Sequence, residues 1–479
     1  MLDGTSVGCA TSTTDTADLS ILAGSPRQVA SPFLIHLADT ITELQAYRDL
    51  RHVQFVQRQD LFSRTDRDDT DDDPRTAVLV ATADDGRVLG GVRLGPCTPV
   101  DIGWWSGSRL VVADDAHAAG IGAALVRAAC AFAEGHDVLR FDATVQERYR
   151  RLFTSLGWDD LGTGPVIRGR LHRHMSWPIG RLQAHSDDTK SGLAHAIRPF
   201  AAQSGGLGPA GFCGDDGVPV PHSDLVAACD AIIPSMVERD PEWAGWCSVL
   251  VNLNDLSAMG ADPVGMLDSV GAPSTAHLHR IIRGIADAAQ MWRTPVLGGH
   301  TQLGVPAALS VTVLGRTPQP VPGGGGRAGH TVSLIADLGG SWRAGYQGRQ
   351  WDSTSTRSSG ELVGMSSIVG GLRPAAAKDV SMAGLVGTLG MLAEASGTGA
   401  ELDVAAIPRP DSAAMGAWMT CFPGFAMLVA DKRRIADAPG PATAAPCGRL
   451  TSQAGVRLRW PDGRTTTAVE STVTGLGIA

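Results

Sequence analysis

The sequence is poor in aromatic residues and has no long apolar run. Aromatic residues make up 5% of the 479 positions, whereas apolar residues make up 43%, enough for packed globular domains. No apolar run reaches the roughly 20 residues that a helix needs to cross a bilayer, so we expect no membrane partner. Residues 1–20 have neither a basic start nor an apolar core, so no signal peptide is predicted. We therefore expect a cytoplasmic protein.

The charge and the cysteines argue against two further classes. The formal net charge of -9 disfavours a general nucleic-acid binder, which needs a basic face. The eight cysteines are scattered, without a Cys-x-x-Cys pair. This spacing favours reduced thiols over a disulfide framework or a zinc ribbon. We expect the partner to be a small-molecule substrate.

A chain of 479 residues is too long for one typical core and suggests about two or three domains. Residues 1–32 have the composition of a disordered tail. Residues 33–178 alternate strand and helix signals, and 179–213 gain Ser, Gly and Pro, as a linker would. A second block covers 214–318, and after a Pro/Gly run a third covers 327–479. The predicted fold class is α/β and α+β, with a mixed-sheet domain followed by a two-part α+β unit.

Periodicity places the main elements within these blocks. Apolar residues at every third position predict a helix over 41–56, and two apolar runs around a turn predict a hairpin over 77–94. The remaining predicted elements are strands at 109–112, 138–145, 307–314 and 331–338, and helices at 120–134, 278–291 and 382–396.

A glycine turn at His117–Leu125 lies where a predicted strand passes into a helix. Such a turn can present backbone N–H groups to an anion, aided by the helix dipole, or it can simply start a helix without a ligand. With the strand at Arg109–Val112 and the segment Phe153–Trp158, the turn resembles the acetyl-CoA-binding core of the GNAT N-acetyltransferases over about 33–178. By this resemblance, acetyl-CoA is a cofactor whose pyrophosphate is bound at the turn. The implied cofactor-binding residues are His117, Ala118, Gly120, Ile121, Gly122 and Ala123.

Two positions depart from the GNAT pattern. The usual Arg or Gln at the head of the turn is His117. The Tyr that often protonates the departing thiolate falls at Phe153, which cannot donate a proton. Tyr149 is the candidate catalytic residue in its place, or it only packs.

Four polar motifs mark the C-terminal half. The segment Val251–Ala261 is predicted to be a buried strand that delivers Asp255 to the start of a small-residue helix. The other three are Gly214-Asp215-Asp216-Gly217, Gly298-Gly299-His300-Thr301 and Lys378-Asp379-Val380-Ser381. A lone Asp beside glycine is usually a turn, but four such sites suggest oxygen ligands around magnesium and a nucleotide.

These motifs resemble the AIR synthase (PurM) superfamily from about residue 211 onward, which includes thiamine-monophosphate kinase, selenophosphate synthetase and HypE. The resemblance implies ATP and Mg²⁺ as cofactors and a homodimer. The implied metal ligands are Asp215, Asp216, Asp230, Asp255 and Asp379. The implied nucleotide-binding residues are Gly214, Asn254, Gly298, Gly299, His300 and Thr301, with Lys378 as a catalytic residue. Selenium chemistry is disfavoured because the Cys/Lys loop expected upstream of Asp215 is absent.

Three further clusters are open to two interpretations each. The acidic run between Asp66 and Asp73 could attract a cationic amine or form a solvated loop. His172 and His174 could carry protons or belong to the core or surface. The segment Trp342–Ser353 could shape a substrate pocket or form a loop anchored by its two tryptophans.

The combination resembles the GNAT and AIR-synthase-related proteins encoded in nitrilase-associated gene clusters, here in one chain. An acetyltransferase makes an amide, and AIR synthase phosphorylates an amide oxygen before ring closure. Our hypothesis is a bifunctional enzyme whose first product is the substrate of the second step. The alternatives are an independent acyltransferase joined to a small-molecule kinase, and an ATP-dependent enzyme regulated by a non-catalytic CoA-sensing domain.

Overall fold

The computed structural model describes residues 33–115 and 120–479. The predicted tail at 1–32, and His117 and Ala118 of the glycine turn, lie outside the described residues. The chain falls into two compact units: the first contains the residues up to Asp68, Ala77–Arg93 and Arg109–Ala128, and the second contains the rest.

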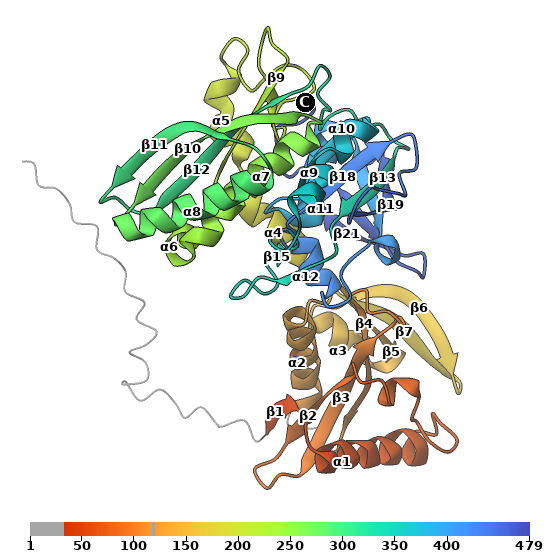
Figure 1. The fold of residues 1–479 in the computed structure, drawn as a ribbon. Helices are drawn as coiled ribbons and strands as arrows, with labels where there is room; N and C mark the ends of the chain where they lie inside the picture. Colours follow the sequence, from red (N-terminus) through yellow and green to blue (C-terminus); the bar gives the residue numbers. More distant parts are fainter. Residues whose placement is uncertain (1–32, 116–119) are drawn as a thin grey trace, which may run out of the picture. The chain divides into compact units, whose positions relative to one another are not determined.

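The N-terminal region is built on one mixed seven-stranded sheet (Figure 1), with the strand order β1-β2-β3-β4-β5-β7-β6. Its strands are β1 (Leu34–Leu37), β2 (Ala77–Thr82), β3 (Val88–Pro96), β4 (Trp104–Val112), β5 (Arg140–Gln146), β6 (Asp159–Ile167) and β7 (Arg170–Trp177). The β1–β2 and β5–β7 pairs are antiparallel, whereas β4 and β5 are parallel. The predicted hairpin and the mixed sheet are confirmed.

The helices of this region begin and end where local signals place them. Thr40 caps α1 (Ile41–Arg51) through a capping box with Glu43, and the helix continues as the π-helix η2 (His52–Arg58). The others are η3 (Asp69–Asp71), α2 (Ile121–Gly135), η5 (Glu147–Tyr149) and α3 (Arg150–Ser155). The helices predicted at 41–56 and 120–134 are thus present.

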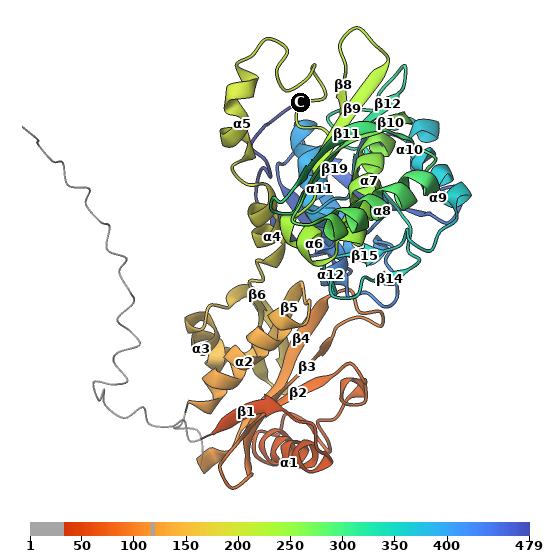
Figure 2. The ribbon, with the colours of Figure 1, turned by 60° about the vertical axis from the view of Figure 1, so that its left-hand side comes forward.

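A five-stranded sheet with the order β11-β10-β12-β9-β8 follows in the second unit (Figures 1 and 2). Its elements are β8 (Val218–Pro219), β9 (Leu225–Ala231), α6 (Pro234–Arg239), α7 (Pro241–Ala258), β10 (Asp262–Ala272), α8 (Thr275–Met291), β11 (Val296–Leu303) and β12 (Ala308–Arg316). Helices α7 and α8 cover one face of the sheet and pack on each other. Every residue of the edge strand β11 is exposed.

The buried strand predicted within Val251–Ala261 to deliver Asp255 to a helix start is wrong, because residues 251–258 form the second half of α7. Leu253 and Leu256 there, and Val249 and Leu250 just before them, are at most 1% exposed. A helix that is buried on most of its surface has apolar and small residues all round it. Its short apolar runs cannot be distinguished from a buried strand by periodicity.

The C-terminal part contains a second seven-stranded sheet, with the order β16-β18-β13-β19-β17-β20-β21. Its strands are β13 (Thr331–Ala336), β16 (Ala376–Asp379), β17 (Gly399–Asp403), β18 (Ala426–Asp431), β19 (Thr443–Thr451), β20 (Val456–Arg459) and β21 (Thr465–Val469). The other elements are β14 (Ser341–Trp342), β15 (Trp351–Asp352), α9 (Ser359–Ser366), α10 (Ile368–Leu372), α11 (Gly384–Ala395), η6 (Val404–Ala406) and α12 (Met415–Thr420). The strand predicted at 331–338 and the helix at 382–396 correspond to β13 and α11.

The segment interpreted as a linker, 179–213, contains two helices, α4 (Arg181–Lys190) and α5 (Leu193–Ala201). Helix α4 packs against α11 and buries only Leu182 and Ser186. A stripe of two residues gives almost no periodic signal, which explains why the helix was missed. Among the described residues, no helix has the length and apolar character needed to span a bilayer.

We predict that close packing of α7 on α8 is needed for the stability of the part of the chain built on the five-stranded sheet. A Cβ added at Gly284 would overlap the carbonyl oxygen of Glu242, so Gly284→Ala must push the two helices apart. The free energy of unfolding should fall by about 1–3 kcal/mol, measured by urea denaturation. The matched control is Gly364→Ala in α9, where an added Cβ meets nothing within 4 Å. An equal loss of stability in both variants would contradict this account.

Candidate functional site

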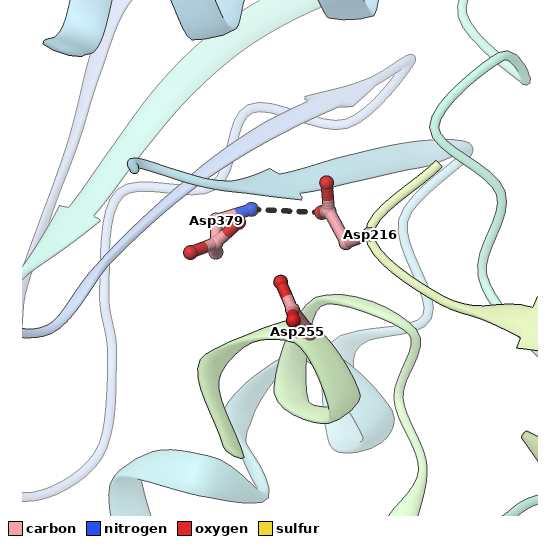
Figure 3. A group of neighbouring side chains, drawn as sticks. All are labelled: Asp216, Asp255 and Asp379. Carbon is pink, nitrogen blue, oxygen red and sulfur yellow. Dashed lines mark hydrogen bonds between the residues drawn. The ribbon is translucent and has the colours of Figure 1, made fainter. Parts of the chain in front are cut away.

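Three carboxylates from three separate elements meet in the second unit (Figure 3). Asp379 ends β16, Asp255 lies in the last turn of α7, and Asp216 lies in the loop before β8. One carboxylate oxygen from each lies within 4.8 Å of the others. The Asp379 backbone N–H donates a hydrogen bond of 3.0 Å to Asp216 Oδ2, which joins two of the three elements. We call Asp216, Asp255 and Asp379 the carboxylate triad.

The triad is electrostatically unfavourable in the absence of a cation. Asp255 and Asp379 are 6% and 4% exposed. Burial raises the pKa of both carboxyls well above the usual range, and the neighbouring carboxylates raise them further. Burial also raises the pKa of Asp216 to about 6. A bound divalent cation would reverse this preference and stabilise the charged carboxylates.

The donor set of the triad fits magnesium. All three donors are carboxylate oxygens, without His or Cys, and hard cations such as Mg²⁺ prefer oxygen ligands. Asp379 Oδ2 is buried and has no hydrogen-bond partner among the described residues. A buried acceptor without a donor is costly unless a ligand satisfies it. The triad can therefore hold a hard cation.

Beside the triad, Lys378 and Asp215 form an ion pair whose polar atoms are bonded to other protein groups. Lys378 Nζ donates to Asp215 Oδ1 at 2.9 Å and to Asp216 Oδ1 at 2.8 Å, and its side chain is 2% exposed. Burial alone would lower the pKa of Lys378, but the carboxylates of Asp216 and Asp215 raise it above its usual value. Lys378 is therefore a fixed cation that bridges the carboxylates of Asp215 and Asp216 and offsets their repulsion. Its assignment as a catalytic residue stays a prediction.

Asp215 differs from the triad in its partners. Besides Lys378, it accepts hydrogen bonds from the backbone N–H groups of Gly323 at 2.6 Å and Asp216 at 2.9 Å. Its oxygens are thus occupied by protein donors, so this structure favours a role in shaping the loop. Metal ligation by Asp215 stays a prediction.

Asp230, on β9, lies near the triad without being part of it. Its charge contributes to raising the pKa of both Asp255 and Asp379. Burial raises the pKa of Asp230 itself, and the ammonium of Lys190 opposes that rise. Metal ligation by Asp230 stays a prediction.

The loop that carries Asp216 is held by residues that the sequence analysis missed. A Cβ added at Gly323 would overlap Asp215, and one added at Gly214 would overlap Leu476. The segment around Leu476 is itself held by Glu394, whose carboxylate accepts from the N–H groups of Val473 at 2.8 Å, Thr474 at 2.9 Å and Gly477 at 3.0 Å. Gly323 was visible only as part of a Pro/Gly boundary, and Glu394 had no sequence signal.

The other predicted nucleotide residues lie elsewhere. Asn254 is 3% exposed, and its amide nitrogen donates to the carbonyl of Gly424 at 2.7 Å. Gly298, Gly299, His300 and Thr301 lie on the exposed edge strand β11, paired with residues 267–270 of β10. They are not members of the triad, and their role in binding stays a prediction.

The predicted acyl-CoA turn is only partly described. Gly120 has a φ of 74°, and α2 begins at Ile121. Ile121 is fully buried, and the role of Ile121, Gly122 and Ala123 in binding acetyl-CoA stays a prediction. Tyr149 precedes α3, is 41% exposed and lies under the guanidinium of Arg148 at 4.7 Å. Phe153 is buried edge-on against Trp158, which places it in the core.

Part of each of the three open clusters makes structural contacts. Asp66 pairs with Arg51 at 2.6 Å, and Asp68 pairs with Arg93. His172 is buried, and its Nδ1 bonds to the carbonyl of Arg170 at 2.9 Å. In the 342–353 segment, Trp351 packs edge-on against Trp342 and Trp418 and is 1% exposed. The loop anchored by tryptophans is the interpretation that the packing supports.

Comparison with known families agrees with this organisation. The model of the AIR synthase related protein N-terminal domain matches residues 214–317, and that of its C-terminal domain matches 372–461. The Acetyltransferase (GNAT) family model matches 44–158. An uncharacterised protein of Synechocystis sp. is 33% identical over 233 residues, covering 47% of this chain and 71% of that protein.

A thiamine-monophosphate kinase aligns over a shorter stretch, and a solved structure matches at lower identity. The thiamine-monophosphate kinase of Rhodopirellula baltica is 31% identical over 129 residues, which cover 25% of this chain and 41% of the kinase. The solved structure of AaThiL complexed with AMPPCP and TMP is 21% identical and covers 57% of this chain and 93% of that chain, with a TM-score of 0.45. The chain therefore spans about two fifths of the length of the Rhodopirellula kinase.

We predict that Asp255→Asn weakens Mg²⁺ binding at least about tenfold, because one charged ligand of the triad is lost. Isothermal titration with MgCl₂ measures this. The same variant should melt at a higher temperature than the wild type without metal, because it removes one of several buried like charges. Asp287→Asn, on the exposed side of α8, is the control and should change neither quantity. Unchanged Mg²⁺ affinity in Asp255→Asn would exclude Asp255 from the site.

Proposed function

Because this chain belongs to the AIR synthase-related proteins and carries a GNAT acetyltransferase domain at residues 44–158, we propose that it couples acetyl-CoA-dependent N-acylation of a small amine to ATP-dependent activation of the resulting amide. The observation that carries the ATP-dependent half is the carboxylate triad, in which an oxygen of Asp379 has no hydrogen-bond partner within the described part of the chain.

In the second unit, Asp216, Asp255 and Asp379 would hold Mg²⁺, with Asp230 beside them. Bound magnesium would neutralise charge on the phosphates of ATP. The chain's own contribution is rigidity. Lys378 locks the Asp215–Asp216 loop, and the N–H group of Gly323 fixes Asp215. Phosphoryl transfer depends mostly on such positioning and on electrostatics, so a preformed carboxylate site is suited to it.

The proposed ATP-dependent reaction has two steps. An amide oxygen attacks the γ-phosphorus of ATP, the bond from phosphorus to the bridging oxygen breaks, and ADP leaves. An internal amine then attacks the amide carbon, the carbon–oxygen bond breaks and inorganic phosphate leaves. The net change in the acylated substrate is the loss of one water molecule as the ring closes.

The acyltransferase domain would supply the amide. The amine nitrogen attacks the thioester carbonyl of acetyl-CoA, and CoA leaves as the thiol. The backbone N–H groups at Gly120–Ala123 are placed at a helix start, where a pyrophosphate is favoured. Tyr149 is exposed and carries a hydroxyl that can protonate the thiolate.

This proposal predicts a specific mass change. The purified protein is incubated with a small-molecule extract and isotope-labelled acetyl-CoA, with and without Mg-ATP, and new masses are followed by mass spectrometry. We expect a labelled adduct that loses the mass of water only when ATP is present. An adduct that is indifferent to ATP would establish two independent activities and contradict the coupling.

Phe153, which stands where the GNAT pattern often has a proton-donating Tyr, motivates one alternative, a CoA-sensing domain without catalysis. The same assay separates it from the proposal. Acetyl-CoA that binds and changes the rate of ATP turnover, but yields no labelled product, would favour the sensor.

We further propose that the chain forms a homodimer through the exposed face of the five-stranded sheet. Leu297 and Leu303 on β11 are 58% and 53% exposed, and Leu267 on β10 is 43% exposed. An apolar sheet edge in water tends to pair with another chain. The predicted nucleotide residues Gly298–Thr301 lie on this strand, so a second copy would bring them to an interface.

The dimer proposal predicts a mass in solution of about twice 49.8 kDa, measured by light scattering with size-exclusion chromatography. Leu297→Asp should shift the protein toward the monomer, because a buried charge at an interface is costly. Val166→Asp, at a comparably exposed apolar position on β6, is the control and should leave the mass unchanged. A monomeric wild-type protein at micromolar concentration would contradict the proposal.

A further inference from the structure

Residues 473–479, which we call the strap, lie against the loop that carries Asp216. The strap contains no helix or strand. Four of its side chains each lie on a glycine of another segment, so close that an added Cβ on the glycine would be 2.9 Å or less from the strap side chain. The pairs are Val473 on Gly390, Leu476 on Gly214, Ile478 on Gly397 and Ala479 on Gly324.

One carboxylate, that of Glu394 on α11, fastens the strap. Its Oε2 accepts hydrogen bonds from the N–H groups of Val473 at 2.8 Å and Thr474 at 2.9 Å. Its Oε1 accepts from the N–H group of Gly477 and from the hydroxyl of Thr474, both at 3.0 Å. The Thr474 hydroxyl oxygen accepts in turn from the N–H group of Leu476 at 3.2 Å. Glu394 is 7% exposed, and hydrogen bonds to a charged acceptor are stronger than neutral ones.

The rest of the strap is weakly packed. Only Val473 and Thr474 are buried, whereas the side chain of Ile478 is 75% exposed. Segments with few buried apolar contacts open locally at a lower free energy than the core. The strap can therefore detach from Glu394 while the sheets stay folded.

The contact of Leu476 with Gly214 connects the strap to the carboxylate triad. Gly214 precedes Asp216 by two residues. The Oδ2 atom of Asp216 accepts a hydrogen bond of 3.0 Å from the N–H group of Asp379. Repulsion between like charges favours the separation of Asp216 from Asp255 and Asp379, and a bound cation would reverse that preference. A side chain that lies on Gly214 limits the movement of the loop, so the strap keeps the three carboxylates together.

We propose that Glu394 and Leu476 are positioning residues for the metal site, and that closure of the strap is coupled to binding of Mg²⁺ at the carboxylate triad. A closed strap keeps Asp216 in place and thereby raises the affinity for the cation. A bound cation must then favour the closed strap by the same factor, because coupling between two equilibria is reciprocal. The inference rests on the proposed function and adds the strap to it. The strap lies outside residues 372–461, which the family model of the C-terminal domain matches.

Hydrogen exchange on the full-length protein tests the coupling directly. The peptide that covers residues 471–479 is followed by mass spectrometry with and without saturating MgCl₂. Exchange of this peptide should slow at least about fivefold when Mg²⁺ is bound, the lower end of typical coupling between sites. A peptide from the β6–β7 hairpin is the control and should not change. Calorimetry on the same sample measures whether Mg²⁺ binds.

The two measurements separate the failure of this inference from the failure of the proposed function. Bound Mg²⁺ with slowed exchange of the strap alone supports the inference. Bound Mg²⁺ with unchanged exchange of the strap overturns the inference and leaves the proposed metal site standing. Absence of Mg²⁺ binding overturns both.

Two variants of the strap test whether Leu476 transmits the coupling. Leu476→Ala removes the side chain that lies on Gly214 and keeps the bonds to Glu394, so Mg²⁺ affinity should fall at least about fivefold. Ile478→Ala is the matched control, since it makes the same reduction in size on Gly397, away from the loop, and should retain the wild-type affinity. Leu476→Met conserves volume and should retain most of the affinity. Equal losses of affinity in Leu476→Ala and Ile478→Ala would overturn the inference.

Glu394→Gln tests the fastening of the strap. The substitution replaces one carboxylate oxygen by an NH₂ group, which cannot accept a hydrogen bond. The strap should then exchange rapidly with and without MgCl₂, and Mg²⁺ affinity should fall at least about fivefold. A lower melting temperature with unchanged Mg²⁺ affinity would show that Glu394 only stabilises the fold, and would overturn its role as a positioning residue.

Discussion

The repulsion among buried carboxylates is the constraint on which the second unit depends. Asp216, Asp255 and Asp379 converge with one oxygen each within 4.8 Å, in a place where burial favours their neutral forms. Such an arrangement costs folding free energy unless a cation compensates it. Lys378 supplies a cation beside the triad, and an oxygen of Asp379 has no hydrogen-bond partner among the described residues. Our proposal is that this arrangement is preformed for a further cation, and preformation of this kind lowers the cost of binding a charged substrate.

The surrounding backbone keeps the carboxylates in place. Glycine at 323 and 214 allows Asp215 and Leu476 to approach closer than a side chain would permit. Glu394 ties the segment around Leu476 to α11, whose N-terminus follows Asp379 closely in the chain. The same segment holds the start of α5, where the Ala194 N–H donates to the carbonyl of Thr474. Residues far apart in sequence thus form one support for the site.

Much of this organisation could be predicted from the sequence, and the failures have physical reasons. Motifs with an Asp beside small residues indicated Asp216, Asp255 and Asp379. Both signals can be read from residue types: Asp supplies the carboxylate, and small residues allow the backbone to approach closely. The strand predicted around Asp255 is wrong, because α7 is buried on nearly all sides and has no polar face that would indicate a helical period. Helix α4, Glu394 and the contact of Gly323 with Asp215 could not be predicted, because they depend on tertiary neighbours.

The most direct test of the account is to locate the cation. Crystals grown with Mn²⁺ and AMPPCP would show the metal by its anomalous scattering, and Mn²⁺ takes the same oxygen ligands as Mg²⁺. We predict an anomalous peak bounded by the carboxylates of Asp216, Asp255 and Asp379, with the nucleotide phosphates beside it. A nucleotide and metal bound at another place, with no peak at the triad, would contradict it.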